Sequence, residues 1–173
     1  MRIYRKYIYN YPMDMVLKIT HYDLVRNPKT YEDLQNVTSV KLSHFVEHPD
    51  GRQDIEFTYC AHGQIPPFAQ KILTPKMLTW REVSRWDPQR RVYHFEIIPF
   101  YLRNLFMSKG DWTYEEKDGK TIQIEEGQLS IRVPVIGPLI EQAIVNELYK
   151  NQDEANRTHL KNLEKLAKES SKK

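Results

Sequence analysis

The C-terminal segment constrains the fold more than any other part of this chain, because it lacks helix-breaking residues. Neither glycine nor proline occurs after Pro138 in the 173 residues. Proline is tolerated in the first turn of a helix, so the spacing predicts a helix that begins at Gly137 and Pro138 and reaches Ala167. At 1.5 Å of rise per residue, this helix is roughly 45 Å long. An element of that size must pack on something equally large.

The chain before this helix alternates apolar and polar residues with the period of two that is typical of strands. We predict a first strand over residues 3–9 and six further strands from Val37 onward. Turn-forming residues separate the later strands at His48-Pro49-Asp50-Gly51, Asp87-Pro88-Gln89-Arg90 and Lys117-Asp118-Gly119-Lys120. Two short helices fit between the first two strands, one after Pro12 and one near residues 31–35. The hairpins together predict an antiparallel meander.

This order of elements predicts an α+β fold of the helix-grip type. A curved seven-stranded antiparallel sheet wraps around a long C-terminal helix, with two short helices after strand 1. The chain length suits one domain with a substantial core. We place that domain over residues 1–168 and a solvated tail over residues 169–173.

The last strand carries a conflict of parity. Ile122 and Ile124 lie on one face of an extended strand, whereas Leu129 and Ile131 lie on the other. A strand cannot change its buried face without an extra residue. We therefore predict a β-bulge near residues 125–127, with Ile124 facing the interior.

Composition excludes several classes of protein. Cys60 is the only cysteine, so an internal disulfide is impossible, and the net charge of +3 is small. The basic N-terminus lacks the apolar core of a signal peptide, and the longest apolar run is far shorter than the roughly 20 residues of a membrane span. We expect a cytoplasmic protein that does not bind nucleic acid.

Three short motifs resemble those of a known group of proteins. They are Tyr9-Asn10-Tyr11-Pro12, Ile65-Pro66-Pro67-Phe68 and Val133-Pro134-Val135-Ile136-Gly137. With the predicted order of elements, they make the chain resemble the START-like (Bet v 1-like, SRPBCC) superfamily, closest to the bacterial domain-of-unknown-function 2505 family. The chain is also similar to the PRELI/MSF1 lipid-transfer domains. The resemblance implies an internal ligand cavity whose entrance lies at the connector around Phe68.

Aromatic and aliphatic side chains of the sheet and helix share the predicted inner face. They either line a pocket or fill the core completely. The predicted ligand-binding residues are Tyr59, Phe68, Trp80, Phe95, Tyr101, Phe106, Trp112, Leu129, Ile131, Ile140, Ile144 and Leu148.

Two connectors between strands are unusually apolar. One carries Ile65, Phe68, Ile72 and Leu73, and the other carries Phe100, Tyr101, Leu105 and Phe106. They either form a lid at the mouth of a cavity or cap the core permanently. Lys71, Arg103 and Lys109 lie in or near them, where cations suit an anionic membrane surface or a lipid headgroup.

Two carboxylates stand out as polar groups for the predicted cavity. Glu147 falls among the apolar residues of the helix, and Glu82 shares its face with Trp80. Each is either a cavity group or an ordinary solvated acid, and the solvated reading is favoured. His44 and His48 lack further metal ligands at suitable spacing, and no nucleophile or nucleotide motif occurs, so we expect neither a metal nor a cofactor.

The sequence therefore predicts binding, and by extension transport, of a lipid or other hydrophobic small molecule, with transient contact to an anionic membrane surface. The first alternative is a START-like enzyme, a cyclase or hydrolase that uses Glu82 or Glu147. The second is a scaffold or regulatory protein with a filled core. A binding protein is preferred over an enzyme because catalytic motifs are missing.

Overall fold

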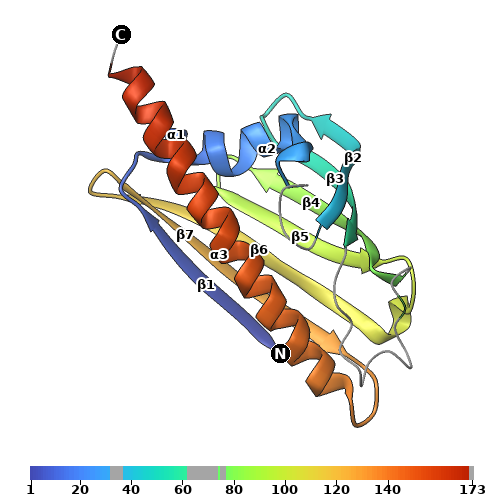
Figure 1. Cartoon of the computed structure of the whole chain (residues 1–173). Coiled ribbons are helices and arrows are strands. Elements are labelled where there is room, and N and C mark those ends of the chain that lie inside the picture. The colour runs from blue at the N-terminus through green and yellow to red at the C-terminus, as the bar shows by residue number, and fades with distance from the viewer. Residues whose placement is uncertain (32–36, 62–73, 75–76, 172–173) are drawn as a thin grey trace.

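The computed structural model describes residues 1–31, 37–61, 74 and 77–171, which form two layers (Figure 1). One layer is a curved sheet of seven antiparallel strands, and the other is helix α3 (Gly137–Ser170), which crosses the inner face of the sheet diagonally. The strands are β1 (Arg2–Tyr9), β2 (Val37–Glu47), β3 (Gln53–Ala61), β4 (Thr79–Asp87), β5 (Val92–Pro99), β6 (Phe106–Lys117) and β7 (Lys120–Ile131). The predicted helix-grip fold is confirmed.

The strand order is β1-β7-β6-β5-β4-β3-β2, so the first strand returns to pair with the last. All three predicted hairpin turns are present. Gly51 and Gly119 adopt positive φ angles of 82° and 73°, which residues with a Cβ atom rarely adopt. In the turn after β4, the carboxylate of Asp87 accepts the backbone N–H groups of Gln89 and Arg90 at 3.0 Å.

Strand β7 has a regular register, so the predicted β-bulge near residues 125–127 is wrong. Its register is continuous against β6 from Lys120 to Ile131 and against β1 from Thr121 to Gln128. Odd-numbered residues therefore face inward throughout, and Ile124 points outward, contrary to the prediction. The inner face of β7 is polar where Gln123 and Glu125 lie. Gln123 is satisfied there, because it accepts a hydrogen bond from Tyr9 and donates one to Tyr114, both of 2.9 Å.

The segment between β1 and β2 is more helical than the sequence suggests. Helix α1 (Met13–Leu17) continues through a π-turn, η1 (Lys18–Tyr22), into α2 (Asp23–Arg26), and a 3-10 turn, η2 (Pro28–Tyr31), follows. The Thr20 hydroxyl donates to the Val16 carbonyl at 2.8 Å, and this competition for a helical acceptor suits an irregular turn. The second short helix therefore begins earlier than predicted, and residues 32–35 of the predicted helix lie outside the described residues.

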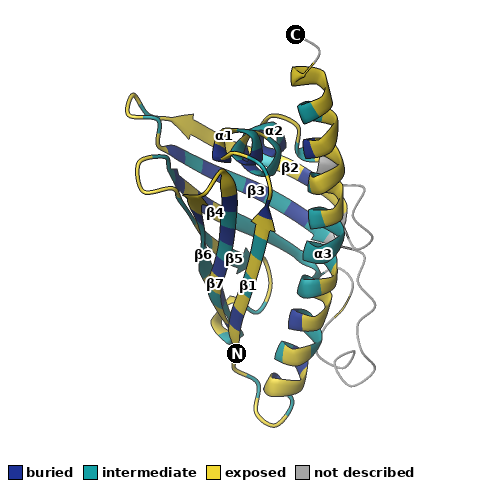
Figure 2. Ribbon diagram, turned by 90° about the vertical axis from the view of Figure 1, so that its left-hand side faces the viewer, coloured by how far each residue is buried: buried dark blue, intermediate teal, exposed yellow. Residues whose placement is uncertain are grey.

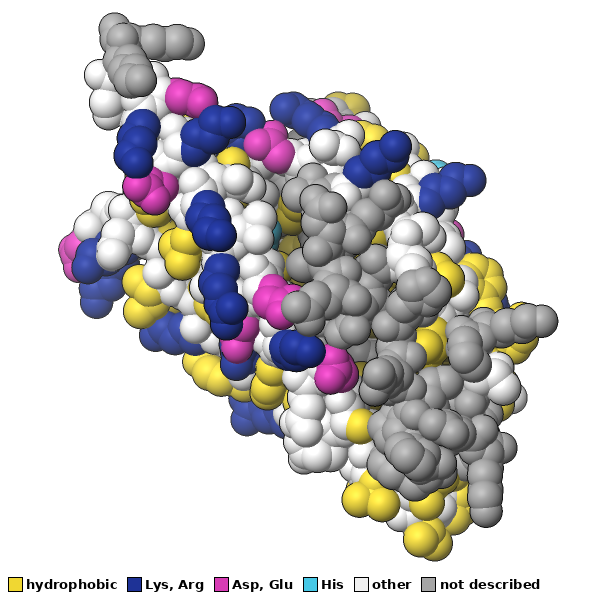
Figure 3. Space-filling view, viewed as in Figure 1, with side chains coloured by type: hydrophobic (Ala, Val, Ile, Leu, Met, Phe, Trp, Pro, Cys, Tyr) yellow, Lys and Arg dark blue, Asp and Glu magenta, His cyan; other side chains and the backbone are white. Residues whose placement is uncertain are grey.

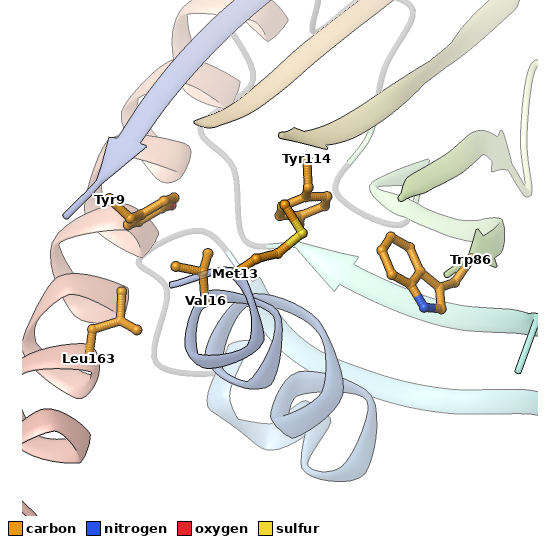
Figure 4. Packing of buried hydrophobic residues seen from close by; sticks show 6 residues of the cluster. All are labelled: Tyr9, Met13, Val16, Trp86, Tyr114 and Leu163. Atoms are coloured by element: carbon orange, nitrogen blue, oxygen red, sulfur yellow. The ribbon is translucent and has the colours of Figure 1, made fainter. Parts of the chain in front are cut away.

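Buried apolar side chains form three separate clusters. The upper cluster joins β1, α1 and the C-terminal half of α3 (Figure 4); its members are Tyr9, Met13, Val16, Trp86, Tyr114 and Leu163. The lower cluster, at the other end of α3, contains Ile3, Leu129 and Val145. The side cluster lies between α2 and the far strands and contains Val25, Val40, Ile55, Phe57 and Tyr59. The middle of the inner face lies between these clusters.

Candidate functional site

The middle of the inner face is polar, and we call it the polar band. Its members come from three strands and from α3: Glu82, Ser84, Tyr93, Glu125, Gln152 and Asn156. The register places the sheet members on one face, because Glu82 lies opposite Ile97, and Glu125 lies opposite both Arg5 and Trp112. The sequence therefore brings polar groups into the interior from distant parts of the chain.

Glu82 is the carboxyl of the band with the most hydrogen-bond partners. Its Oε1 accepts hydrogen bonds from the Ser84 hydroxyl at 2.9 Å and from the Tyr93 hydroxyl at 2.8 Å, and Tyr59 is a third hydroxyl partner. Burial raises the pKa of the Glu82 carboxyl, and the three hydroxyls oppose that rise. The side chain is surrounded by protein and is half-buried from solvent.

Glu125 lies deeper, with 2% of its surface exposed. Gln152 of α3 donates a hydrogen bond of 2.7 Å to its Oε2. Burial raises the pKa of Glu125 to about 7; the Gln152 hydrogen bond and the Arg5 charge oppose this rise, and the Glu82 charge adds to it. Glu125 therefore changes charge near neutral pH, and the two carboxyls influence each other.

The central stretch of α3 that faces the sheet is polar. Gln152, Asn156 and His159 recur at intervals of four and three residues, between Val145 in the lower cluster and Leu163 in the upper cluster. Burial lowers the pKa of His159 to about 4, so its imidazole is neutral at physiological pH. The buried side-chain oxygens of Gln152 and Asn156 have no hydrogen-bond partner among the described residues. Such oxygens are costly and point to a missing donor.

Arg5 stands at the β1 edge of the inner face and is held there. Its guanidinium pairs with Asp153 of α3, hydrogen-bonds the Tyr7 hydroxyl at 3.0 Å, and lies 4.7 Å from the ring centre of Tyr149. No other described strand residue that shares this face is Lys or Arg. The charge of the polar band is therefore predominantly negative.

Two glycines leave the middle of the inner face without side chains. Gly110 and Gly127 are register partners on β6 and β7. A Cβ atom at Gly110 would lie 2.8 Å from the Gly127 Cα and 3.0 Å from the Phe95 ring. The ring therefore lies against bare backbone, close to the sheet, and the space toward α3 stays wider than a larger residue would allow.

Most predicted ligand-binding residues lie between the sheet and α3. Tyr59, Leu129 and Ile140 are fully buried in or beside the apolar clusters. The others between the two layers are half-buried: Trp80, Phe95, Phe106, Trp112, Ile131, Ile144 and Leu148. Tyr101 differs, because 49% of its surface is exposed at the connector between β5 and β6. Phe68 lies outside the described residues, as do Ile65, Ile72 and Leu73 of the predicted lid.

The residues predicted to make polar contacts do not lie together at one site. Glu147 is exposed, away from the sheet, in agreement with the solvated interpretation that the sequence favoured (Figure 3 shows the charged outer side of α3). Lys109 lies within β6, close to the second connector, and its side chain points to the outer face of the sheet. Arg103 is exposed in η4 (Arg103–Leu105) and donates to the Pro99 carbonyl at 3.1 Å. Lys71 lies outside the described part of the chain.

The sequence analysis missed Glu125, Gln152, Asn156 and His159. The sequence did contain a signal for them. Thr121, Gln123 and Glu125 share one parity with the buried Leu129, and Gln152, Asn156 and His159 follow the helical spacing that leads from Val145 to Leu163. The assumption that only apolar residues face inward concealed both patterns.

Two open depressions lie outside the polar band. One, of about 920 Å³, covers the outer face of the sheet, where charged side chains such as Asp54, Arg85 and Glu126 line it. The other, of about 320 Å³, lies between α2 and the β2–β3 hairpin. The outer depression has the paired charges of a solvated surface, so its size does not make it the candidate site. Among the described residues, no group of three His, Cys, Asp or Glu side chains could hold a metal ion.

Comparison with known proteins adds a family and a fold. The family described as protein of unknown function (DUF2505) matches residues 9–159. No curated protein matches the sequence. None of the helices in the described part of the chain has the length and apolar character needed to cross a membrane.

Solved structures share the architecture at low sequence identity. TTHA0849 from Thermus thermophilus is 14% identical with a TM-score of 0.61, over 94% of this chain and 97% of that one. A START superfamily protein from Mycobacterium smegmatis is 10% identical with a TM-score of 0.58, over 94% and 98%. The di-domain ARO/CYC StfQ from the steffimycin biosynthetic pathway is 14% identical with a TM-score of 0.56, over 94% of this chain but 46% of its own length. The START-like fold expected from the sequence is therefore confirmed.

Proposed function

This chain belongs to the DUF2505 family of proteins of unknown function, and from that premise we propose that it binds a lipid or similar hydrophobic small molecule between the sheet and α3. One observation carries the proposal. Seven of the predicted ligand-binding residues lie on the inner face of the sheet or on α3 and yet remain half-buried. Figure 2 shows residues of this intermediate class in teal on the strands and on α3. Apolar groups that keep accessible surface inside a two-layer domain favour a cavity over a filled core.

The arrangement of the clusters supports the same conclusion. The three apolar clusters close the two ends and one side of the inner face, and they leave its middle to the polar band. A pocket with mostly apolar walls and a few polar groups is the usual form of a small-molecule site. The polar groups then orient a ligand whose remaining surface packs on Trp80, Phe95 and Trp112.

Transport between membranes is the further part of this proposal. Val135, in the turn before α3, and Leu139, in its first turn, are 90% and 56% exposed. Hydrophobic side chains gather at the lower end of the molecule in Figure 3. Phe100 and Tyr101 are also exposed, next to the cation Arg103. Exposed apolar residues beside a cation suit transient contact with an anionic bilayer.

The direct test is native mass spectrometry of the purified protein, followed by extraction and identification of bound molecules. Ile97→Trp adds bulk to the inner face, whereas Ile98→Trp adds the same bulk to the outer face one residue later. We expect a bound hydrophobic molecule in the wild type and in Ile98→Trp, and at least a roughly tenfold lower occupancy in Ile97→Trp. An empty wild-type protein that takes up no offered lipid would contradict the proposal and favour a scaffold with a filled core.

An enzyme is the second candidate, and one observation favours it. Glu82 and Glu125 occupy the same interior, and the charge of one raises the pKa of the other, as in sites where two carboxyls divide the roles of acid and base. Glu82→Gln and Glu125→Gln would then abolish turnover of a bound molecule but preserve its binding. Unchanged mass of the ligand after prolonged incubation with wild-type protein would exclude this candidate for that ligand.

A further inference from the structure

The hydroxyl donors of the polar band all serve one carboxyl, and two side-chain oxygens of the band have no described partner. The hydroxyls of Tyr59, Ser84 and Tyr93 all serve Glu82. The side-chain amide of Gln152 donates to Glu125, while its oxygen has no described partner. A molecule that enters this region therefore meets a carboxyl whose neighbouring hydroxyls already donate to it, and few further donors that it can use.

The charge of the region reinforces this asymmetry. Both ionisable groups of the band are carboxyls, and the neighbouring cation, Arg5, is engaged by Asp153 and the Tyr7 hydroxyl. An anionic group placed in the band would lie beside Glu82 and Glu125 without a free cation among the described strand residues of this face. Repulsion and desolvation both oppose that placement.

Glu82 is the member of the band that a ligand can reach. It keeps accessible surface, whereas the unpartnered oxygens of Gln152 and Asn156 are sealed by neighbouring atoms. A carboxyl held by three hydroxyls is also fixed in orientation, which suits recognition of a donor with little loss of entropy.

We infer that the bound molecule buries a hydroxyl or an amine against the Glu82 carboxyl, and that any anionic group of the molecule stays outside the polar band. This inference rests on the proposed function and specifies the ligand class. It excludes a fatty acid bound with its carboxylate inward. It favours long-chain alcohols, sterol-like alcohols and amphiphilic amines, in which a donor terminates an apolar body.

A set of ligands that share one apolar chain separates the alternatives. Dodecanol, dodecylamine, dodecanoate and dodecane are titrated into the full-length protein, each below its solubility limit and, for the two charged ligands, below its micelle concentration. Affinity is measured by tryptophan fluorescence and calorimetry. We expect dodecanol and dodecylamine to bind about tenfold more tightly than dodecanoate or dodecane, the factor that one buried hydrogen bond supplies. Dodecylamine should gain further above pH 7, where Glu125 is ionised.

Two matched variants test the assignment to Glu82. Glu82→Gln keeps the shape but adds a donor, so we expect it to lose about tenfold in dodecylamine affinity and to bind dodecanoate more tightly. Glu147→Gln removes an exposed carboxylate on the outer side of α3 and should change neither affinity. Circular dichroism of both variants checks that the fold is retained.

The possible outcomes bear on different claims. Wild-type protein that binds dodecanoate as tightly as dodecanol would overturn the inference and leave the proposed function standing. A preference for donors that persists in Glu82→Gln would overturn the assignment to Glu82. Failure of all four ligands to bind, together with an empty protein in native mass spectrometry, would overturn the proposed function itself.

Discussion

The outer and inner faces of the same sheet treat charged residues in opposite ways. On the outer face, opposite charges on neighbouring strands form ion pairs: Arg2 with Glu126 at 2.9 Å, Arg85 with Asp54 at 3.0 Å, and Arg81 with Glu56 at 3.3 Å. On the inner face, Glu82 is held by hydroxyls and Glu125 by an amide. Because successive side chains of a strand point to opposite faces, one strand such as β4 carries charged residues both in the interior and on the solvated surface.

The pKa values express this difference. Hydrogen bonds from His48 and then Arg85 lower the pKa of the outer residue Asp54, whereas burial raises the pKa of the inner residues Glu82 and Glu125. Outer charges are stabilised by partners and water, so each contributes little alone. Inner carboxyls are tolerated at a cost in stability, which is typical of groups kept for function. Paired substitutions on adjacent residues can test the contrast.

The largest expected difference between the faces involves Trp86 and Arg85. Trp86 has no exposed surface in the upper cluster, whereas Arg85 forms an exposed ion pair on the outer face. Trp86→Ala should lower the free energy of unfolding by about 4 kcal/mol through the cavity that it creates. Arg85→Ala should lower it by less than about 1 kcal/mol. Urea denaturation measures both values, and similar losses would remove the distinction between a packed inner face and a solvated outer face.

The second comparison sets Glu125 against its outer neighbour Glu126. The folded-state pKa of Glu125 is raised from 4.5 to about 7, so the folded state binds a proton that the unfolded state has released. The contribution of Glu125 therefore favours folding below pH 4.5 and is lost as the pH rises toward 7. Glu125→Gln should leave stability unchanged at low pH and raise it by up to about 3 kcal/mol above neutrality.

Glu126→Gln is the control for this measurement. The Glu126 side chain is 57% exposed in its ion pair with Arg2, so its substitution should change stability by less than about 0.5 kcal/mol. Denaturation midpoints across the pH range record both variants. A Glu125→Gln protein whose pH profile parallels that of the wild type would show that folding does not shift the pKa of Glu125.

The buried histidine His159 changes stability with pH in the direction opposite to Glu125. Burial lowers the pKa of His159 from 6.5 to about 4, so the folded state stays neutral while the unfolded state takes up a proton. Stability from this group is present above pH 6.5 and is lost as the pH falls toward 4. His159→Gln should reduce the acid slope of stability by one proton, about 1.4 kcal/mol per pH unit. His44→Gln, on the exposed outer side of β2, should leave that slope unchanged.

Local chemistry made much of the fold predictable. The turns at Gly51 and Gly119 and the helix start at Pro138 follow from backbone preferences of single residues. The parity of β3 to β6 followed from apolar residues that do face inward, such as Phe57 and Phe95. These preferences depend only on residues close together in sequence, so a single sequence is enough to predict the elements that they determine.

The polar band was not predictable in the same way. Gln123 faces inward because Tyr9 and Tyr114 satisfy it, and Tyr9 comes from a strand 114 residues away in sequence. Similarly, Glu125 depends on Gln152 of α3. Partners that only the folded chain brings together decide whether a polar residue is buried, whereas hydrophobicity alone favours the opposite parity. The solvated interpretation favoured for both carboxylates agrees with the exposure of Glu147 but not with Glu82, which is held by hydroxyls in the interior.

The smallest expected effect is the coupling within an outer ion pair. Arg2 and Glu126 lie 2.9 Å apart with side chains that are 75% and 57% exposed. A double-mutant cycle with Arg2→Ala and Glu126→Ala should give a coupling of about 0.5 kcal/mol or less, which disappears in high salt. The same cycle between Glu125 and Gln152 should give a larger coupling that salt does not screen, because water is excluded there. Equal couplings at the two sites would mean that water reaches Glu125 as freely as Glu126, and the polar band would then be an extension of the surface.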